Sequence, residues 1–572
     1  MEKIWLKQYD EGVPATIDIP DISVDRFLID SAKRFPHNPA LIFFNKKITY
    51  AELNDMVNRF AAALQVSGFK KGDRIALYLP NCPQFTIAYY GALRAGGIVV
   101  PSNPLYVPRE LEHQIKDSGA TFVVSLSLLY GRLKKVRKNL NLKQVIVTNI
   151  KEYFPPITKL LFTLFRENKP DMNGERHSLT ITDEPNVTMW FRDFLRLGHK
   201  GPAPVKVSSS DTAVLMYTGG TTGVPKGAQL THRNLVANAL QVASWIPGME
   251  DGKAVMMTAL PLTHSYSMTV SQNHSIYRGF AQVLIPNARD LTDVLKNLQN
   301  HRVTLFPGVP TLYTAINNHP DVKAGKYDLS SIKACISGAA GLPQEVQREF
   351  MKITGGKLIE GYGLSEASPV CTVNPLGSMG KIGSIGVPIP NTNVKIVDSE
   401  TGKKVLPIGE IGELCVRGPQ VMKGYWNMPT ETANVLRPDE NGDVWLHTGD
   451  IAAMDEDGYL SIKDRKKDMI IAGGYNIYPN EVEDVLYTHP DILEAAVVGV
   501  PHETRGEVVK AFVVLKEGAS LTEEELRQWC KQEMRAYMVP KYVEFRDELP
   551  KTMVGKILRR QLLEEEKQKS QN

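Results

Sequence analysis

Cysteine is scarce in this sequence of 572 residues, and long apolar runs are missing. The five cysteines are scattered, odd in number and never spaced C-x-x-C. This pattern argues against a disulfide framework or a zinc site and predicts free thiols in a reducing compartment. No stretch reaches the roughly 18 uninterrupted apolar residues that a membrane-spanning helix needs. The first residues also lack the basic-then-apolar order of a secretory signal.

A strong imbalance of charge is missing as well. The net charge is +4 at pH 7, which is small for this length, so the composition gives no reason to expect nucleic-acid binding. Apolar residues make up 42% of the chain and charged residues 23%, which is ordinary for a globular protein. We therefore expect a cytoplasmic protein, and its size favours several domains.

Short apolar runs alternate with amphipathic stretches through the longer, N-terminal part of the chain. The composition of residues 74–79, 97–100, 303–306 and 332–336 is typical of buried strands. Residues 83–93 and the segment after Pro310 have the apolar spacing of helices. Strands that alternate with helices predict α/β units around parallel sheets.

The pattern changes after about residue 388. Residues 393–418 consist of short strand-like runs separated by turn residues, which predicts a small, mostly antiparallel β subdomain. A compact charged segment at 464–468 precedes a last unit with its own helix and strand patterns. We expect an N-terminal domain over residues 1–465 and a smaller C-terminal domain over residues 466–572.

One segment, residues 154–166, is strongly apolar with Lys159 and Arg166 at its edges. Such a segment forms either a short helix packed on its own domain or a patch that rests on a bilayer surface. We expect the packed helix, because one short patch gives weak membrane affinity. Peripheral contact with the inner face of the cell membrane is the alternative.

Residues 218–227 carry the chemistry that binding of a polyphosphate needs. Glycines let the backbone approach an anion closely, threonine hydroxyls donate hydrogen bonds to phosphate oxygens, and Lys226 adds a mobile positive charge. No Gly-Lys pair is followed by Ser or Thr, so this is not a Walker A loop, and residues 228–231 continue as a second strand. The residues expected at the phosphates are Thr218, Gly219, Gly220, Thr221, Thr222, Gly223 and Lys226.

At this point the sequence resembles a known family. Residues 217–227 look like the AMP-binding signature of the adenylate-forming superfamily, which contains acyl-CoA synthetases, firefly luciferase and the adenylation domains of peptide synthetases. Segments 360–366, 445–450, 464–476 and 550–559 resemble its later motifs, in family order. The resemblance covers nearly the whole chain. It implies a large N-terminal domain of two α/β subdomains and a β subdomain, with a small mobile C-terminal α+β domain.

The resemblance also implies roles for single residues. Tyr362 would stack near adenine, Ser365 would touch the α-phosphate, and Glu366 would hold Mg²⁺, which prefers oxygen ligands. Asp450 and Arg465 would bind the ribose. Gly361 and Gly363, which belong to the segment 360–366, are further expected nucleotide contacts.

Four more assignments rest on the same resemblance. Lys467 would be the pivot between the domains, and Gly473 and Gly474 would line a tunnel for the pantetheine of coenzyme A. Lys556 would reach the α-phosphate and the acyl carboxylate, where a cation stabilises the negative charge of the transition state. Gly338 and Ala339 would leave space for an acyl chain beside the nucleotide.

The stretch 260–268 bears on which acid is activated. It lacks the acidic residue that amino-acid adenylation domains use to bind an amine, so an amino-acid substrate is disfavoured. His264 matches acyl-CoA synthetases and is a candidate catalytic residue, with a buried structural histidine as the alternative. Thr263 and Ser267 depart from the aromatic residue and the glycine of that family, which leaves the shape of the pocket open.

Segments 307–313 and 337–343 look most like the long-chain fatty acyl-CoA synthetases. The expected reaction joins a long-chain or medium-chain fatty acid to coenzyme A at the expense of ATP, with Mg²⁺, through an acyl-AMP intermediate. The alternatives are an aryl or short-acid CoA ligase, an acyl-AMP ligase that feeds a carrier protein, and a non-catalytic nucleotide-binding scaffold. Assembly into a homo-oligomer stays open.

Overall fold

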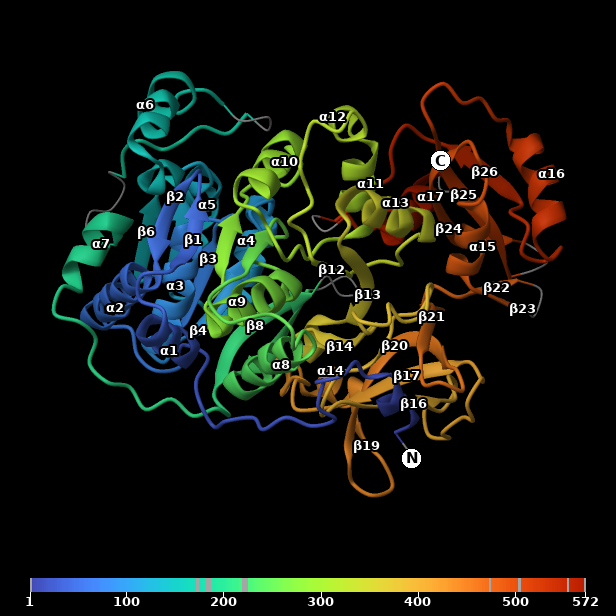
Figure 1. Ribbon diagram of the computed structural model, residues 1–572, viewed down its shortest axis with the longest axis horizontal. Helices are drawn as coiled ribbons and strands as arrows, with labels where there is room; N and C mark the ends of the chain where they lie inside the picture. The colour runs from blue at the N-terminus through green and yellow to red at the C-terminus, as the bar shows by residue number, and fades with distance from the viewer. Residues whose placement is uncertain are drawn as a thin grey trace.

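The computed structural model describes residues 3–170, 174–181, 187–218, 225–472, 475–502, 506–552 and 555–569, and Figure 1 shows their arrangement. The first α/β subdomain is built on an eight-stranded sheet whose central strands are parallel. β9 is antiparallel to β8, and β18 pairs with β9 at the edge of the sheet. Across the sheet the strands are β18 (Gly424–Tyr425), β9 (Lys226–Thr231), β8 (Thr212–Thr218), β4 (Ile98–Ser102), β3 (Arg74–Tyr78), β5 (Phe122–Leu126), β6 (Gln144–Thr148) and β7 (Thr188–Trp190).

The second α/β subdomain contains two four-stranded sheets. Isolated parallel bridges at Leu305 join β10 to β12 and thereby connect them. Residues 303–306 were expected to be a regular strand and form only such bridges, because Pro307 has no N–H with which to extend the ladder. The strands run β2 (Lys46–Thr49), β1 (Pro39–Phe43), β11 (Ala281–Leu284), β10 (Val255–Thr258), and then β12 (Ala334–Ser337), β13 (Lys357–Gly363), β14 (Val370–Val373), β15 (Val387–Pro388).

Helices fill the space between these sheets. α3 buries nearly every residue, and its Thr86 and Tyr90 donate hydrogen bonds to Gln272 and Asn273 of the π-helix η4. The helix layer therefore holds the two subdomains together. The helices of this part are α1 (Arg26–Arg34), α2 (Tyr50–Val66), α3 (Pro83–Arg94), α4 (Pro108–Ser118), α5 (Tyr130–Val136), α7 (Phe191–Leu197), α8 (His232–Ser244), η4 (Ser267–Asn273), α9 (His274–Arg278), α10 (Leu291–Asn300), α11 (Pro310–Asn318), α12 (Pro320–Lys323) and α13 (Gln344–Thr354).

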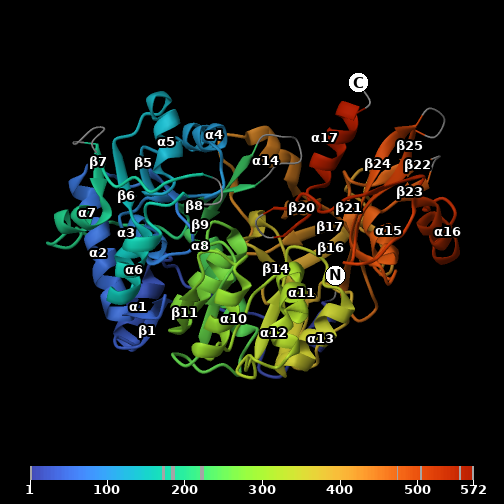
Figure 2. The ribbon, with the colours of Figure 1, turned by 90° about the horizontal axis from the view of Figure 1, so that it is seen from above.

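The β subdomain and the C-terminal domain each have a sheet of their own, and they occupy the right-hand half of Figure 1. β21 ends at Arg465 in the first of these sheets, and β22 begins at Ile470 in the second. Seen from above, the C-terminal sheet stands at the end of the molecule away from α7 (Figure 2). The strands are β16 (Asn393–Val397), β17 (Gly412–Arg417), β19 (Leu436–Pro438), β20 (Val444–Met454) and β21 (Leu460–Arg465), then β22 (Ile470–Ala472), β23 (Tyr475–Ile477), β24 (Ile492–His502), β25 (Gly506–Leu515) and β26 (Tyr542–Phe545).

The remaining helices of this half are α14 (Pro429–Val435), α15 (Pro479–Leu486), α16 (Glu523–Glu533) and α17 (Arg559–Lys569). The structure thus confirms the predicted α/β architecture, with an antiparallel β subdomain and a separate C-terminal unit. All five cysteines are buried and free, as the sequence predicted. Among the described residues no helix has both the length and the apolar character to cross a membrane.

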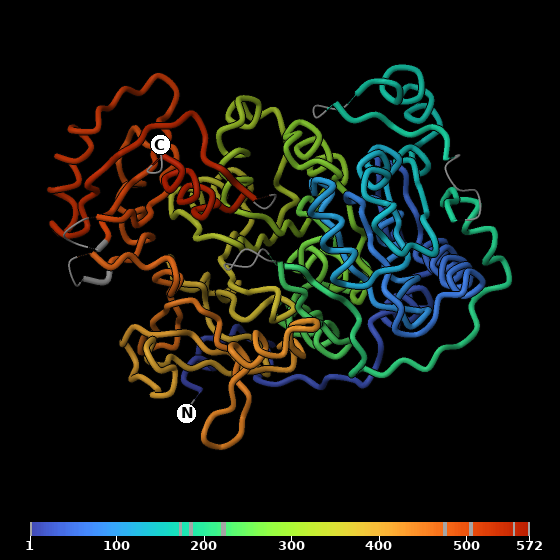
Figure 3. Tube along the Cα trace, turned by 180° about the vertical axis from the view of Figure 1, so that it is seen from behind, coloured from blue at the N-terminus to red at the C-terminus, as the bar shows by residue number. Residues whose placement is uncertain are grey.

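The packed helix expected over residues 154–166 is present, but it packs on the domain through one face alone. The helix forms, as α6 (Pro156–Phe165), but none of its residues is fully buried. Only Phe162 packs against aromatic neighbours, Phe154 and His177. The amphipathic pattern is therefore turned outward, because the apolar stripe of the helix faces away from the domain. α6 and the C-terminal domain lie at opposite ends of the molecule, as Figures 1 and 3 show.

Candidate functional site

Three strands meet at the centre of the candidate site. β13 brings Tyr362 and β20 brings Asp450, whose carboxylate accepts a hydrogen bond from the Tyr362 hydroxyl at 2.5 Å. β21 pairs with β20 so that Arg465 is the register partner of Asp450, and Arg465 Nε lies 3.3 Å from Asp450 Oδ1. Asp450 is only 6% exposed. The pairing of β21 with β20 explains how Arg465 reaches Asp450.

The electrostatics of this group follow from burial and from the carboxylate. Burial raises the pKa of Tyr362, and the negative charge of Asp450 adds to that effect. Burial works against the charge of Arg465, but the negative groups around it, Asp450 first among them, together raise the pKa of Arg465. Tyr362 and Arg465 thus hold the Asp450 carboxylate from two sides. A carboxylate held in this way can accept hydrogen bonds from the hydroxyls of a diol such as ribose.

The C-terminal domain contributes Lys556 to the same site. Its loop is fixed by a hydrogen bond from the Lys556 N–H to Thr552 Oγ1 at 3.1 Å. Gly555 has φ +73°, and a Cβ there would lie 2.3 Å from Thr311 Oγ1 of the N-terminal domain. A side chain at position 555 would therefore force the loop away from α11. The glycine lets the two domains approach closely.

Lys556 lies among charged groups of both signs. Burial lowers its pKa to about 8, and the positive charge of Arg465 lowers it further, whereas Asp450 acts in the opposite direction. Burial lowers the pKa of His264 to about 4, and Lys556 contributes to that shift. Because its pKa lies well below 7, His264 is neutral at neutral pH. The structure therefore brings together Lys556, His264, Asp450 and Arg465.

A second group of side chains lies around Glu366 and Lys226, two further residues that were predicted to contact the nucleotide. The Glu366 carboxylate accepts a hydrogen bond from the Tyr425 hydroxyl at 2.8 Å. Lys226 forms an ion pair with Glu431 of α14 and lies over the Tyr425 ring, 5.3 Å from its centroid. Sequence reasoning missed Tyr425 and Glu431, because β18 and α14 reach the phosphate loop only through the pairing of β18 with β9.

The other predicted contacts lie along β13 and just after β12. Ser365 Oγ is 3.1 Å from Ser265 Oγ, and Thr218 ends β8. A Cβ at Gly361 would lie 3.3 Å from the Thr372 carbonyl oxygen, a tight contact, and a Cβ at Gly363 would lie 2.2 Å from the Pro369 carbonyl oxygen, a clash. Such a clash would break the pairing of β13 with β14. These two glycines therefore shape the strand that carries Tyr362.

The space beside Gly338 is bounded by an aromatic side chain. A Cβ on Gly338 would lie 3.3 Å from Tyr266 Cε1, and the Tyr266 hydroxyl donates a 2.6 Å hydrogen bond to the Ile336 carbonyl. Ala339, next to Gly338, has φ +70°. Ser267, one of the departures from the family pattern, is buried and donates to the Leu260 carbonyl at 2.7 Å. Tyr266 was not singled out by the sequence.

The junction of the two domains is crossed by an ionic cluster. Arg559 of α17 lies 3.2 Å from Asp464 of β21 and 2.5 Å from Glu483 of α15. Lys467, the predicted pivot, lies between Asp464 and Glu483 in the sequence. Its Nζ is 3.7 Å from Asp468 Oδ1, and burial lowers the pKa of Lys467. Arg559 was not predicted. The remaining predicted residues, Gly219, Gly220, Thr221, Thr222, Gly223, Gly473 and Gly474, lie outside the described residues.

Comparisons with known proteins show the family to which the chain is similar. Residues 28–426 match the AMP-binding enzyme family, and residues 481–556 match the AMP-binding enzyme C-terminal domain. A long-chain-fatty-acid–CoA ligase of Bacillus subtilis is 46% identical over 99% of this chain and 98% of its own. One from Escherichia coli O6:H1 is 43% identical over all of both chains. The crystal structure of ATP-bound MatB from Rhodopseudomonas palustris has a TM-score of 0.82 at 30% identity, and the match covers 95% of this chain and 99% of that chain.

Proposed function

Because the chain belongs to the AMP-binding enzyme family, we propose that it is an AMP-forming ligase that joins a long-chain fatty acid to coenzyme A. The observation that carries the proposal is the position of Lys556, which the C-terminal domain places beside Asp450, Arg465 and His264 of the N-terminal domain. The relatives that match over the whole chain bear the name of this activity. A cation beside a ribose-type carboxylate is suited to the attack of a carboxylate on a nucleotide phosphate.

In the first half-reaction, an oxygen of the fatty acid carboxylate attacks the α-phosphorus of ATP. The new P–O bond forms the acyl adenylate, and the bond to the β-phosphate breaks, so that pyrophosphate leaves with its electron pair. Lys556 stabilises the charge that gathers on the acyl and phosphate oxygens. Asp450 and Tyr362 hold the nucleoside. Lys226 binds the leaving pyrophosphate once it has exchanged Glu431 for phosphate oxygens.

In the second half-reaction, the sulfur of coenzyme A attacks the acyl carbon. A C–S bond forms, the C–O bond to AMP breaks, and AMP leaves with that electron pair while the thiol loses its proton. The chain provides a hinge for the change between the two steps, because the segment at Lys467 joins two separate sheets. The C-terminal domain would then withdraw Lys556 and present the loop at 473–474.

The residues around Glu366 fit a divalent cation held mainly by phosphates. The only partner found for its carboxylate among the described residues is the neutral Tyr425 hydroxyl, so an oxygen remains for Mg²⁺. No group of three metal-binding side chains occurs in the described part of the chain, so a cage made of protein ligands is not indicated there. Bound Mg²⁺ would neutralise phosphate charge during adenylation.

A panel of acids tests the proposal. Release of pyrophosphate is measured with fatty acids of eight to eighteen carbons, with benzoate and with acetate, each with and without coenzyme A. The expected result is turnover with the long chains, and acyl-CoA only when coenzyme A is present. Preference for benzoate or acetate would replace the proposal with the aryl or short-acid alternative. Turnover that coenzyme A does not change would favour an acyl-AMP ligase.

We propose in addition that the protein works on the inner face of the cell membrane, as a peripheral protein. Free long-chain fatty acids partition into bilayers, so an enzyme that consumes them benefits from contact with that surface. The outward-facing α6 supports this location. Sedimentation of cell extracts, followed by a wash in high salt, distinguishes a peripheral protein from one that stays in the supernatant.

A further inference from the structure

The apolar stripe of α6 is the largest cluster of exposed large apolar side chains on any one helix of the described chain. Its members fall at helical spacing i, i+3, i+4, i+7 and i+8, so they share one face. Their exposed fractions run from 51% for Leu161 to 75% for Ile157. The stripe consists of Ile157, Leu160, Leu161, Leu164 and Phe165.

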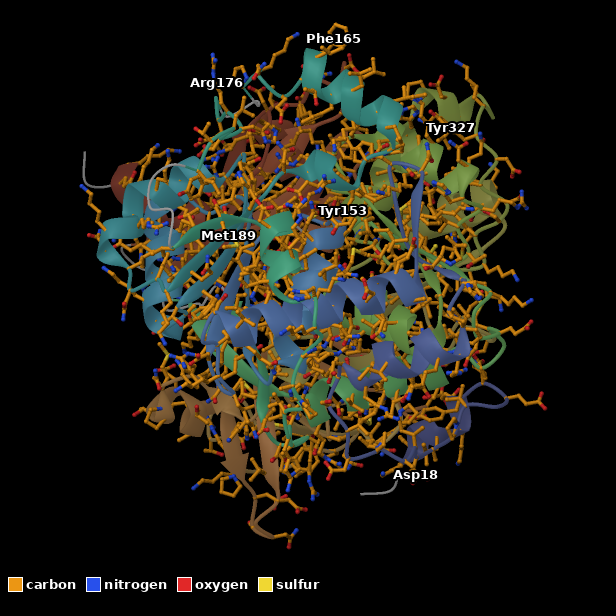
Figure 4. The ribbon with its side chains drawn as sticks, turned by 90° about the vertical axis from the view of Figure 1, so that its left-hand side faces the viewer. Asp18, Tyr153, Phe165, Arg176, Met189 and Tyr327 are labelled. Atoms are coloured by element: carbon orange, nitrogen blue, oxygen red, sulfur yellow. The ribbon has the colours of Figure 1, made fainter. Side chains whose placement is uncertain are left out.

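The opposite face of α6 holds the helix on the domain. Phe162 packs edge-on against Phe154, with ring centroids 5.4 Å apart, and Thr163 Oγ1 accepts a hydrogen bond from Lys151 at 3.0 Å. The helix is thus attached through its less apolar side. In Figure 4, Phe165 lies at the outermost edge of the molecule, and Arg176 lies along the same edge. The orientation of the stripe is therefore set by the fold.

The exposed charges of residues 154–170 are of one sign. From residue 154 to residue 170 the only acid is Glu167, which is buried and bound to Lys151 at 2.5 Å and to Asn149 at 2.7 Å. Arg166 and Lys169, which flank it, are exposed. The end of the helix therefore presents cations beside an apolar face.

More cations lie at the base of α6. Lys159, the lysine in the middle of the helix, lies near the positive charges of Arg192, Lys151 and Lys46, and near the carboxylate of Glu152. Lys46 begins strand β2 and lies over the ring of Tyr153, 5.6 Å from its centroid. Two of these cations have acidic partners, since Lys151 pairs with Glu167 and Arg192 lies 3.7 Å from Glu152. Lys159 and Lys46 have no ion pair among the described residues.

We propose that the stripe on α6 is a docking surface for an anionic lipid leaflet, with the stripe inserted among the acyl chains and the surrounding lysines and arginines at the headgroups. A helix of ten residues is about 15 Å long, half of what a span requires, so α6 lies in the plane of the interface. The cations complement an anionic leaflet and explain why lipid, and not a second apolar protein face, is the occupant. The docking itself is independent of the reaction, whereas its use to collect fatty acid rests on the proposed function.

Flotation with liposomes tests the surface. The complete protein is mixed with vesicles of phosphatidylglycerol and phosphatidylcholine, or of phosphatidylcholine alone, without any substrate. The test variant carries Leu160→Ser, Leu161→Ser and Leu164→Ser. The bound fraction of the wild type should be high on the anionic vesicles, fall by roughly tenfold or more in the variant, and fall with added salt.

A matched control carries Val66→Ser, Ile408→Ser and Val444→Ser, three apolar residues of comparable exposure on other parts of the surface. It should bind like the wild type. Binding of the triple α6 variant equal to that of the wild type, or no binding of the wild type, overturns the proposal. Conversion of a dimer into a monomer by the α6 substitutions, seen by light scattering without lipid, also overturns it, because the face would then serve a second copy.

Activity is measured separately, with a fatty acid dissolved below its micellar concentration. The α6 variant should retain wild-type turnover under these conditions, because the stripe lies at the end of the molecule opposite the C-terminal domain that carries Lys556. A protein that floats but does not activate fatty acids would leave the docking surface intact and refute the proposed function. A protein that activates fatty acids but does not float would support the proposed function and refute the docking surface.

Discussion

The pKa of Lys556 leads to a prediction about pH. In the site without substrate this pKa is lowered to about 8, first by burial and then by the charge of Arg465. The ammonium form is the one that stabilises adenylation, and it exists below the pKa, so activity must fall as pH rises through this value. The fraction of enzyme with Lys556 protonated is about 90% at pH 7 and about 10% at pH 9, by the ordinary titration relation.

The assay is the pH dependence of kcat/KM for ATP in the adenylation half-reaction, followed by release of pyrophosphate without coenzyme A. This quantity reports the pKa values of the free enzyme. It should fall roughly ninefold between pH 7 and pH 9 in the wild type. The Lys556→Arg variant keeps its charge over this range, so its profile should be flat, whatever its absolute rate.

Two controls sharpen this experiment. Lys551→Gln removes a lysine of the same loop that pairs with Glu494, and its profile should follow the wild type. Burial also raises the pKa of Glu360 to about 8, so its titration could produce a similar slope. A fall that persists in Lys556→Arg would assign the slope to Glu360, and a flat wild-type profile would refute the reasoning altogether.

Three further substitutions test other parts of the site. Arg559→Leu leaves Asp464 and Glu483 buried without their cation and should lower the free energy of unfolding by about 3 kcal/mol; thermal melting should show no comparable loss for the exposed Arg560→Leu. Tyr266→Ala should shift the acid panel toward longer or wider acids, and an unchanged order of substrates would show that Tyr266 does not bound the pocket. Lys467→Pro should slow thioester formation from supplied acyl-AMP more than it slows adenylation, and wild-type rates for both steps would rule out the hinge.

The sequence predicted much of the fold because its signals are local. Alternating apolar runs and turn residues located β3, α3 and β8, and the glycine-rich and charged motifs marked most of the candidate nucleotide contacts. The motifs also follow one another along the chain in the order of the family. The position of Lys556 could be proposed only by resemblance, because its neighbours Asp450 and His264 are separated from it by whole subdomains.

What could not be predicted depends on contacts between distant segments. Tyr425 stands in no recognised motif, and only the pairing of β18 with β9 brings it to Glu366 and Lys226. The direction of α6 is a similar case. Its periodicity fixes which residues share a face, but whether that face points inward depends on how Phe162 packs against the rest of the domain.

The ion pair between Lys226 and Glu431 has a consequence for selectivity. Glu431 occupies the cation that a polyphosphate would use, so it acts as an internal competitor tethered to the site. Any incoming anion must displace it, and the apparent affinity of each ligand is reduced by the fraction of time that the pair is closed. A triphosphate with Mg²⁺ would offer more contacts to overcome this competition than free phosphate or a single carboxylate. The carboxylate on α14 would thus keep the abundant small anions of the cell out of the nucleotide site.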